Sequence, residues 1–520
     1  MENPIALPRV YNAAVDLIER NLAAGRATKT AFIDDRGSIT YGALAERVDR
    51  AANAFRSVGI EPEQRMMLCL LDTIDFPVAF LGAIKAGIVP IPVNTMMTAA
   101  DYEFMLRDSR AKALVVSDAL YDRLAPLFAS LPALRHVIVS GGEGISGRLH
   151  LSSLLDAAEP RAKAAETLRD EPCFWLYSSG STGAPKGAVH LHAHLILTAE
   201  HYAKPVLGIA ESDRVFSAAK LFFAYGLGNS LTFPMAVGAT SLLLAERPTP
   251  AVVARLLKER RPTLFYGVPT LYAAMLASPD LPARGEIAVR LCVSAGEALP
   301  EEIGRRWTER FGIEILDGLG STEMLHIFLS NRPGQVRYGT TGVPAPGYEI
   351  RLLDDAGNPV GPGEIGELHV AGPTSAAMYW NNRERSRNTF LGAWTRSGDK
   401  YVRDADGYYT YCGRADDMLK VGGIYVSPFE VEAALMTHEC VLEVAVVGHD
   451  DEHRLVKPKA FVVLRPGKEG SASLAADLQA HVKTRLAPYK YPRWIEFAAE
   501  LPKTATGKIQ RFKLRRGGSG

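Results

Sequence analysis

The residues best suited to chemistry lie between Tyr177 and Gly187, in the sequence YSSGSTGAPKG. Its glycines allow the backbone to turn several N–H groups toward an anion, its hydroxyls add donors, and Lys186 adds a cation. The candidate phosphate-binding residues are Ser178, Ser179, Gly180, Ser181, Thr182, Gly183 and Lys186. Because Lys186 precedes Gly187 and has no Ser or Thr next to it, the segment is not a Walker A loop. A Ser/Gly turn without a ligand is the alternative interpretation.

A strand and a helix are expected on either side of this loop. The apolar run CFWL directly precedes it and the helical-looking AHLILTAEHY follows, an order typical of phosphate sites. The chain alternates in the same way elsewhere. A helix over Phe76–Gly87 is followed by the β-like IVPIPVN, and β-rich runs such as KALVVS and VRLCVSAG are separated by helical stretches such as TPAVVARLLKERR. This pattern predicts an α/β fold with buried parallel sheets.

The last third of the chain has a different sequence pattern. From about residue 350, β segments punctuated by Gly and Pro predict a small antiparallel subdomain with a turn near Asp355 and Gly357. Beyond residue 413, two helical and two β-like stretches predict a small α+β domain. Gly422 and Gly423 lie near this boundary and give the backbone the freedom that a hinge needs.

Composition disfavours several classes of protein. The 520 residues include 59 Lys and Arg against 58 Asp and Glu, so a formal charge of +1 gives no strong attraction to nucleic acid or to an anionic membrane. The five scattered cysteines form no C-x-x-C pair, which fits a reducing cytoplasm. No apolar run approaches the ~20 residues that span a bilayer, and the first residues lack the pattern of a signal peptide. We expect a cytoplasmic enzyme, leave a homodimer open, and interpret residues 517–520 as an added tail.

At the glycine-rich loop the chain resembles the adenylate-forming superfamily, which includes acyl-CoA synthetases, peptide-synthetase adenylation domains and firefly luciferase. Further similar motifs follow in the superfamily's order: SAGEALP at Ser294–Pro300, GSTE at Gly320–Glu323, TRSGD at Thr395–Asp399, GRADDMLKVGG at Gly413–Gly423 and PKTATGK at Pro502–Lys508. The resemblance implies a large N-terminal domain of stacked mixed and parallel sheets with helices over residues 1–413, including a β-rich subdomain at about 340–413. It also implies a hinge over 414–416, around Asp416, and a mobile α+β C-terminal domain over 417–516.

The resemblance also implies roles in nucleotide binding. Glu323 would meet the Mg²⁺ carried by ATP, since this ion prefers carboxylate oxygens, and Asp399 would bind the ribose hydroxyls beside Arg414. The implied catalytic residues are Thr182, Glu323 and Lys508. The Lys508 ammonium would stabilise charge that develops as the acyl-adenylate forms. Further implied nucleotide contacts are Gly296, Glu297, Ala298, Asp317, Gly318, Leu319, Gly320, Ser321 and Thr322. Leu319 departs from the family pattern, which usually has a tyrosine there that stacks on adenine. A helix-start carboxylate at Glu323 and a surface turn at Asp399 are the alternatives.

The combination of KLFFAYG at Lys220–Gly226 with DGLGSTEMLHI at Asp317–Ile327 resembles benzoate-CoA ligases and their hydroxy- or aminobenzoate relatives. Phe223 stands where many fatty-acid enzymes have a histidine. An aromatic wall favours a flat ring by ~0.5–1.5 kcal/mol beyond its buried area. By resemblance, the acyl pocket is lined by Phe223, Ala224, Tyr225, Gly320, His326 and Ile327. Core packing of these aromatic residues is the alternative interpretation.

The resemblance therefore implies a two-step ligase that uses ATP, Mg²⁺ and coenzyme A. A benzoate-class acid would first give acyl-AMP and pyrophosphate, and CoA would then displace AMP. Rotation about Asp416 would present Lys508 for the first step and the loop with Lys420, Gly422 and Gly423 for the second. A substituted-benzoate CoA ligase and a stand-alone adenylation enzyme that loads a carrier protein are alternatives. Luciferase-like oxygenation, a nucleotide sensor and a Rossmann dehydrogenase are disfavoured, the last because the G-x-G-x-x-G pattern fails at Glu323.

Overall fold

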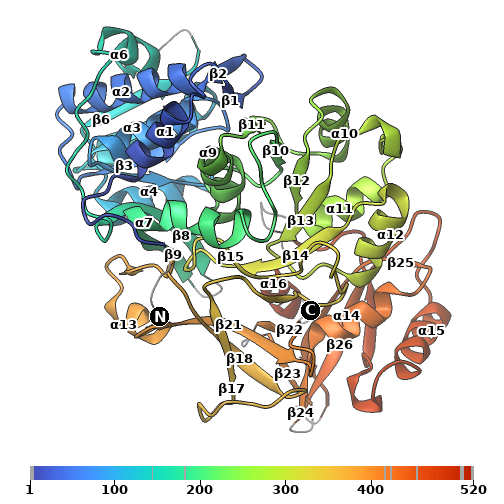
Figure 1. Ribbon diagram of the computed structural model, residues 1–520. Coiled ribbons are helices and arrows are strands. Elements are labelled where there is room, and N and C mark those ends of the chain that lie inside the picture. Colours follow the sequence, from blue (N-terminus) through green and yellow to red (C-terminus); the bar gives the residue numbers. More distant parts are fainter. Residues whose placement is uncertain are drawn as a thin grey trace.

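The computed structural model describes residues 5–142, 145–180, 183–414, 417–421, 424–452, 455–503 and 509–516. Two large sheets with their helices form the N-terminal part of the molecule, an antiparallel β subdomain lies beside them, and a smaller α+β unit ends the chain (Figure 1). The predicted fold class, α/β with a large N-terminal and a small C-terminal part, is confirmed.

The first large sheet has five parallel strands in the order β4-β3-β5-β6-β7. Its strands are β3 (Arg65–Cys69), β4 (Val89–Pro92), β5 (Ala113–Ser117), β6 (His136–Ser140) and β7 (Leu149–His150). The helix expected before β4 is α3 (Asp75–Lys85), and Gly87 follows it with a φ of 81°, a conformation that favours glycine. Pro90 and Pro92 lie in β4, which is an edge strand, where a missing N–H donor is tolerated.

The second large sheet has nine strands in the order β16-β15-β14-β13-β12-β10-β11-β1-β2. The run from β14 to β1 is parallel throughout. These strands are β1 (Thr30–Ile33), β10 (Arg214–Ser217), β11 (Thr240–Leu242), β12 (Leu264–Gly267), β13 (Leu291–Ala295) and β14 (Ile315–Gly320). The outer strands β2 (Ser38–Thr40), β15 (Ile327–Ser330) and β16 (Val343–Pro344) pair antiparallel. The crossover helices include α10 (Pro250–Glu259), α11 (Pro269–Leu276) and α12 (Glu301–Phe311).

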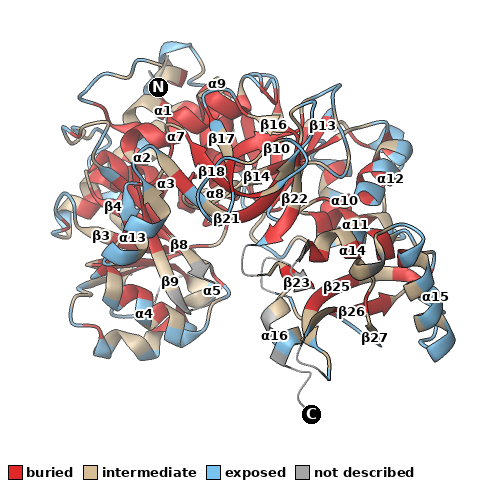
Figure 2. Ribbon diagram, turned by 90° about the horizontal axis from the view of Figure 1, so that it is seen from below, coloured by how far each residue is buried: buried red, intermediate tan, exposed pale blue. Residues whose placement is uncertain are grey.

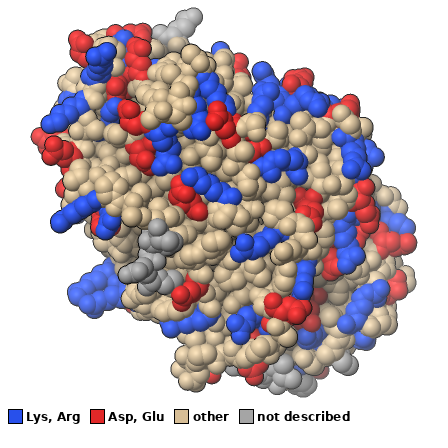
Figure 3. Space-filling model, viewed as in Figure 1, with Lys and Arg blue, Asp and Glu red and all other residues tan. Residues whose placement is uncertain are grey.

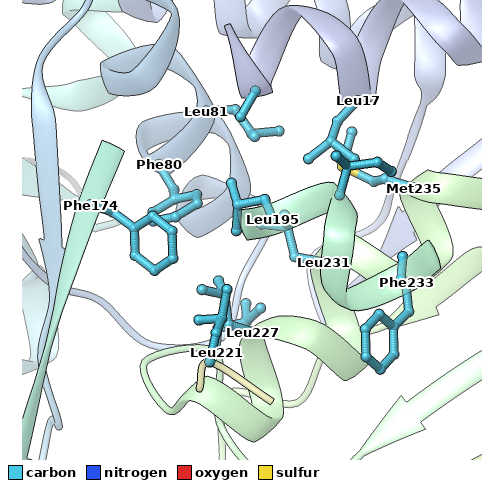
Figure 4. Close-up of a cluster of buried hydrophobic side chains, with 14 of the residues drawn as sticks. Leu17, Phe80, Leu81, Phe174, Leu195, Leu221, Leu227, Leu231, Phe233 and Met235 are labelled. Atoms are coloured by element: carbon cyan, nitrogen blue, oxygen red, sulfur yellow. The ribbon is translucent and has the colours of Figure 1, made fainter. Parts of the chain in front are cut away.

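A large apolar core lies between the two sheets. Helices α1 (Ala13–Ala23), α3, α7 (His192–Thr198) and α9 (Phe233–Val237) contribute to it, and their leucines, phenylalanines and Met235 converge in Figure 4. The rings of Phe80 and Phe174 meet edge to face at 5.6 Å between centroids. Burying one such side chain completely stabilises the fold by about 1.5–3 kcal/mol. Buried residues follow the sheets, whereas α15 exposes much of its surface (Figure 2).

The glycine-rich loop lies at the tip of a hairpin, which corrects the predicted strand, loop and helix order. Strands β8 (Pro172–Gly180) and β9 (Gly183–Leu191) pair antiparallel, with Ser178 opposite Lys186, and α7 begins only after β9. The described phosphate-binding candidates therefore lie on a β hairpin and not at a helix N-terminus. Strand β19 (Met378–Tyr379) pairs with β9 from the other side.

The expected antiparallel subdomain consists of β17 (Glu349–Leu353), β18 (Ile365–Ala371), β20 (Phe390–Leu391), β21 (Trp394–Arg403) and β22 (Tyr409–Arg414). The turn predicted near Asp355 and Gly357 is present: the Gly357 N–H donates to Asp354 O at 3.1 Å, and Gly357 has a φ of 87°.

The C-terminal unit has a hydrophobic cluster of its own. Its elements are β23 (Leu419–Val421), β24 (Ile424–Val426), α14 (Pro428–Met436), β25 (Val441–Asp450), β26 (Val456–Leu464), α15 (Ala472–Lys483), β27 (Trp494–Phe497) and α16 (Arg511–Arg516). On the face shown in Figure 3, basic and acidic side chains are interspersed, in keeping with a net charge near zero. Among the described residues, no helix is long and apolar enough to cross a membrane.

Candidate active site

Lys186 and Glu323 approach each other through Tyr379. The Lys186 ammonium lies 5.0 Å from the centre of the Tyr379 ring, and the Tyr379 hydroxyl donates to Glu323 Oε1 at 2.6 Å. Burial lowers the pKa of Lys186, the Glu323 carboxylate partly offsets this effect, and the positive charges of Arg385 and Arg414 lower the pKa further. A cation and a carboxylate brought together in this way suit a ligand that carries several phosphate groups and a metal ion.

The predicted adenine site lies at the carboxyl ends of two neighbouring parallel strands. In the β13–β14 pair Ser294 lies opposite Asp317 and Ala295 opposite Gly318, so Gly296, with a φ of 96°, turns the chain beside them. Ligands bind at such strand ends in open α/β sheets. Asp317 is buried, and this burial raises the pKa of its carboxyl to about 8, against the lowering effect of the backbone N–H groups of Leu299 and Gly318. Leu319 packs, half-buried, against the central core.

Strand pairing brings Asp399 and Arg414 together as predicted. Asp399 on β21 lies opposite Arg414 on β22, and the guanidinium donates to Asp399 Oδ1 at 3.1 Å. The Asp399 side chain is almost completely buried, and its backbone N–H donates to Ser397 Oγ at 3.0 Å. A carboxylate that is fixed and charged in this way can accept hydrogen bonds from vicinal hydroxyls.

Four of the predicted acyl-pocket residues lie together. His326 Nε2 is 3.3 Å from the Tyr225 carbonyl oxygen, and the two rings are 5.6 Å apart between centroids. Ile327 pairs with Gly320 at the end of the β14–β15 hairpin, where a Cβ on Gly320 would come within 2.7 Å of the His326 backbone. Burial lowers the pKa of His326 to about 3, so this imidazole is neutral at pH 7.

The other two predicted residues lie at the start of α8 (Ala224–Leu227). Phe223 is the residue before this helix and Ala224 is its first residue. The ring of Phe223 contacts Phe222 at 4.5 Å between centroids, and both Phe223 and Ala224 pack, partly buried, against the central core.

The structure adds residues that the sequence did not indicate. Asn229 Oδ1 lies 3.1 Å from His326 Nε2, and the Phe233 ring packs on His326 at 4.4 Å between centroids. Both residues belong to the helical segment after KLFFAYG, which contains a π-helical turn over Gly228–Thr232. Such turns are frequent at functional sites. A polar Asn within an apolar helical run was the available signal. Tyr379 had no local signal, because its partners are distant in sequence.

The C-terminal segment contacts Glu297, one of the predicted nucleotide residues. The backbone N–H of Ile509, the residue after Lys508, donates to Glu297 Oε1 at 3.3 Å. Lys503 and Ile509 form a β-bridge, which brings together the described residues on either side of 504–508. The remaining predicted residues lie outside the described residues: Ser181, Thr182, Asp416, Gly422, Gly423 and Lys508, together with the tail at 517–520.

The site fits a nucleotide and an organic acid, because each part contains a buried polar atom without a partner. Ser178 Oγ at the glycine-rich hairpin, Asp317 Oδ1 at the strand ends and His326 Nδ1 in the acyl pocket have no hydrogen-bond partner within the described part of the chain. Each buried polar group of this kind calls for an explanation, and a ligand that completes the bonding would supply one here. Glu323 offers a carboxylate to a cation that arrives with phosphate oxygens.

Comparisons with known proteins agree with this geometry. The model of the AMP-binding enzyme family matches residues 19–380, and that of the AMP-binding enzyme C-terminal domain matches residues 430–508. The chain is 61% identical to a benzoate–CoA ligase of Thauera aromatica over 98% of this chain and 97% of that protein. It is 50% identical to a 4-hydroxybenzoate–CoA/benzoate–CoA ligase of Rhodopseudomonas palustris, over 98% of this chain and 94% of that protein.

Solved structures of CoA ligases for aromatic acids are also similar to this chain. A benzoate CoA ligase from Burkholderia xenovorans LB400 superposes with a TM-score of 0.92 at 58% identity, covering 97% of this chain and 100% of that one. An anthranilate CoA ligase in complex with anthranoyl-AMP gives a TM-score of 0.94 at 44% identity, covering 98% of each chain. With both family models matched over a site of this composition, the chain belongs to the AMP-binding enzyme family.

Proposed function

We propose that the protein is a benzoate-CoA ligase. It activates benzoate or a close aromatic acid with MgATP to acyl-AMP and pyrophosphate, and then transfers the acyl group to CoA with release of AMP. The observation that carries this proposal is the contact of the partly buried Tyr225 with the buried His326, next to Ile327, in a chain 61% identical to a benzoate–CoA ligase. The five cysteines are buried and free, which supports the cytoplasmic location that we also propose.

In the first step the carboxylate oxygen attacks the α-phosphorus and pyrophosphate leaves. Lys186 would neutralise phosphate charge, and Glu323 would hold the Mg²⁺ of MgATP, which would screen the phosphates and stabilise the leaving group. Asp399, with Arg414 beside it, binds the ribose hydroxyls. The loop would donate further hydrogen bonds to the phosphates, from Ser178, Ser179, Gly180, Ser181, Thr182 and Gly183. The glycine-rich hairpin and the carboxyl ends of β13 and β14 thus hold the two ends of ATP.

Lys508 and the hinge remain proposals that the position of Ile509 supports. The Ile509 N–H donates to Glu297 at 3.3 Å, which supports the proposal that the preceding residue, Lys508, acts at the proposed nucleotide site. We infer that this arrangement serves adenylate formation. Rotation about Asp416 then replaces Lys508 by the loop of Lys420, Gly422 and Gly423 for attack of the CoA thiolate, with residues 417–516 moving as one domain.

A second candidate substrate is a hydroxy- or aminobenzoate. His326 Nε2 faces the Tyr225 carbonyl oxygen, so Nε2 carries the hydrogen and Nδ1 is an acceptor. That buried Nδ1 has no partner within the described part of the chain. A hydroxyl or amino group on the ring would supply the missing donor.

A panel of acids in a pyrophosphate-release assay, with and without CoA, tests the proposal. Benzoate should support release, CoA should be converted to the thioester, and hexanoate or longer linear acids should react poorly. A higher kcat/KM for palmitate than for benzoate would contradict the aryl assignment. A higher value for a hydroxy- or aminobenzoate would establish the second candidate, and adenylate formation without thioester would point to a carrier protein as acceptor.

A further inference from the structure

The turn that carries Glu323 is held at three successive carbonyl groups. His190 Nε2 donates to Thr322 O at 2.7 Å, from strand β9. The Ala376 N–H donates to Glu323 O at 2.7 Å, and Thr374 Oγ1 donates to Met324 O at 2.7 Å. The next residue in the turn, Leu325, has a φ of 66°, a left-handed conformation that costs energy for a leucine. Neighbouring segments therefore fix the turn, in addition to its own hydrogen bond from the Met324 N–H to Ser321 Oγ at 3.2 Å.

From the same neighbourhood, the Tyr379 hydroxyl donates a hydrogen bond to the Glu323 side chain. Tyr379 is only 4% exposed, and its place is fixed by pairing of β19 with β9, where Tyr379 lies opposite Ala188. Its backbone N–H donates to Ser386 Oγ at 2.9 Å, and its ring packs on Phe390 at 5.2 Å between centroids. The phenol thus reaches Glu323 from a rigid support.

We propose that Tyr379 is a positioning residue for the metal-binding carboxylate: its hydroxyl holds Glu323 Oε1 so that Oε2 faces the metal ion of MgATP, while its ring holds the Lys186 ammonium at the phosphates. This inference rests on the proposed function. It concerns two contacts of one side chain, the 2.6 Å hydrogen bond to Glu323 and the 5.0 Å approach of Lys186 to the ring.

The chemistry of the phenol suits this role. A phenol is protonated at neutral pH, so the Tyr379 hydroxyl donates to the Glu323 carboxylate. With Oε1 engaged, a single oxygen is presented to the metal, which suits Mg²⁺ because this ion keeps waters and phosphate oxygens as its other ligands. Partners that orient a metal ligand typically contribute about 10- to 100-fold to metal affinity.

Two substitutions separate the two contacts. Tyr379→Phe removes the hydroxyl and keeps the ring under Lys186, whereas Tyr379→Leu removes both. The matched control is Tyr11→Phe, since the Tyr11 hydroxyl donates to Asp16 Oδ2, also at 2.6 Å, in helix α1. The probe is Mn²⁺ with ATP, and its uptake into the ternary complex is followed by electron paramagnetic resonance. Calorimetry in EDTA gives the affinity for metal-free ATP.

Tyr379→Phe should weaken Mn²⁺ uptake with ATP about tenfold or more and leave metal-free ATP binding within twofold of the wild type. Tyr379→Leu should weaken Mn²⁺ uptake and metal-free ATP binding alike, and Tyr11→Phe should weaken neither of them. In Glu323→Gln, adding Tyr379→Phe should cause no further loss, because the two act through one ligand.

The inference is overturned if Tyr379→Phe takes up Mn²⁺ as the wild type does while Glu323→Gln does not. If Glu323→Gln itself binds Mn²⁺ normally, the metal role in the proposed function fails, and that of Tyr379 fails with it.

Discussion

Gly228→Ala should damage the acyl pocket and spare the nucleotide site. Gly228 lies in the π-helical turn beside His326, and a Cβ at this position would come within 2.3 Å of His326 Cδ2 and 2.6 Å of Nε2. Ordinary contact begins at 3.4 Å, so the ring must move by about 1 Å, although Asn229 and the Tyr225 carbonyl hold its Nε2. A misplacement of about 1 Å near reacting groups can cost roughly 10²-fold in rate.

We therefore expect kcat/KM for benzoate to fall about 10²-fold, with the KM for ATP changed less than threefold, in a pyrophosphate-release assay. Overpacking of this kind also costs about 1–3 kcal/mol of the free energy of unfolding, which urea denaturation measures. The control is Gly285→Ala, because a Cβ at Gly285 meets no atom within 4 Å and should leave both quantities unchanged. Wild-type kinetics for Gly228→Ala would refute the assignment of His326 to the pocket wall.

Three further predictions concern the nucleotide site. Lys186→Ala should raise the KM for MgATP about tenfold or more, the scale of a lost hydrogen bond to a charged group, and an unchanged KM would mean that the hairpin is only a turn. Lys508→Ala should lose acyl-adenylate formation by about 10² to 10³-fold while still converting supplied benzoyl-AMP and CoA to thioester; equal loss in both assays would contradict a role in the first step alone. The pKa of Asp317 is raised from 3.8 to about 8, so the folded protein holds an extra proton between these values, and its stability should fall as pH rises through this window. Between pH 5 and pH 8, the free energy of unfolding measured in urea should fall less for Asp317→Asn than for the wild type. The same fall in both proteins would exclude this titration.

Local sequence predicts elements well where the local pattern and the tertiary position agree. The helix ending before Gly87 and the strand after it are examples, since an edge position tolerates Pro90 and Pro92. The strand β9 was missed, because it is stabilised by pairing with β8 and with the distant β19. Its sequence AVHL continues into a helical pattern, and only the pairing shows where the strand ends.

The proposed nucleotide motifs can be located residue by residue in the sequence, because each is a compact run such as GSTE or TRSGD. Asp399 and Arg414 meet across neighbouring strands as expected. The residues that orient these groups were not predictable. Tyr379 and Asn229 act through contacts 56 and 97 positions away along the chain, and the left-handed Leu325 has no sequence signal at all.

Transfer of labelled oxygen tests the central claim most directly. If benzoate is activated as an acyl-adenylate, its carboxylate oxygen bonds to the α-phosphorus and remains there when the CoA thiolate attacks the carbonyl carbon. Benzoate carrying ¹⁸O in both carboxylate positions should therefore yield benzoyl-CoA, pyrophosphate and AMP. The AMP should contain one ¹⁸O atom for each thioester formed, which mass spectrometry measures. AMP without the label, or ADP as the nucleotide product, would contradict the account.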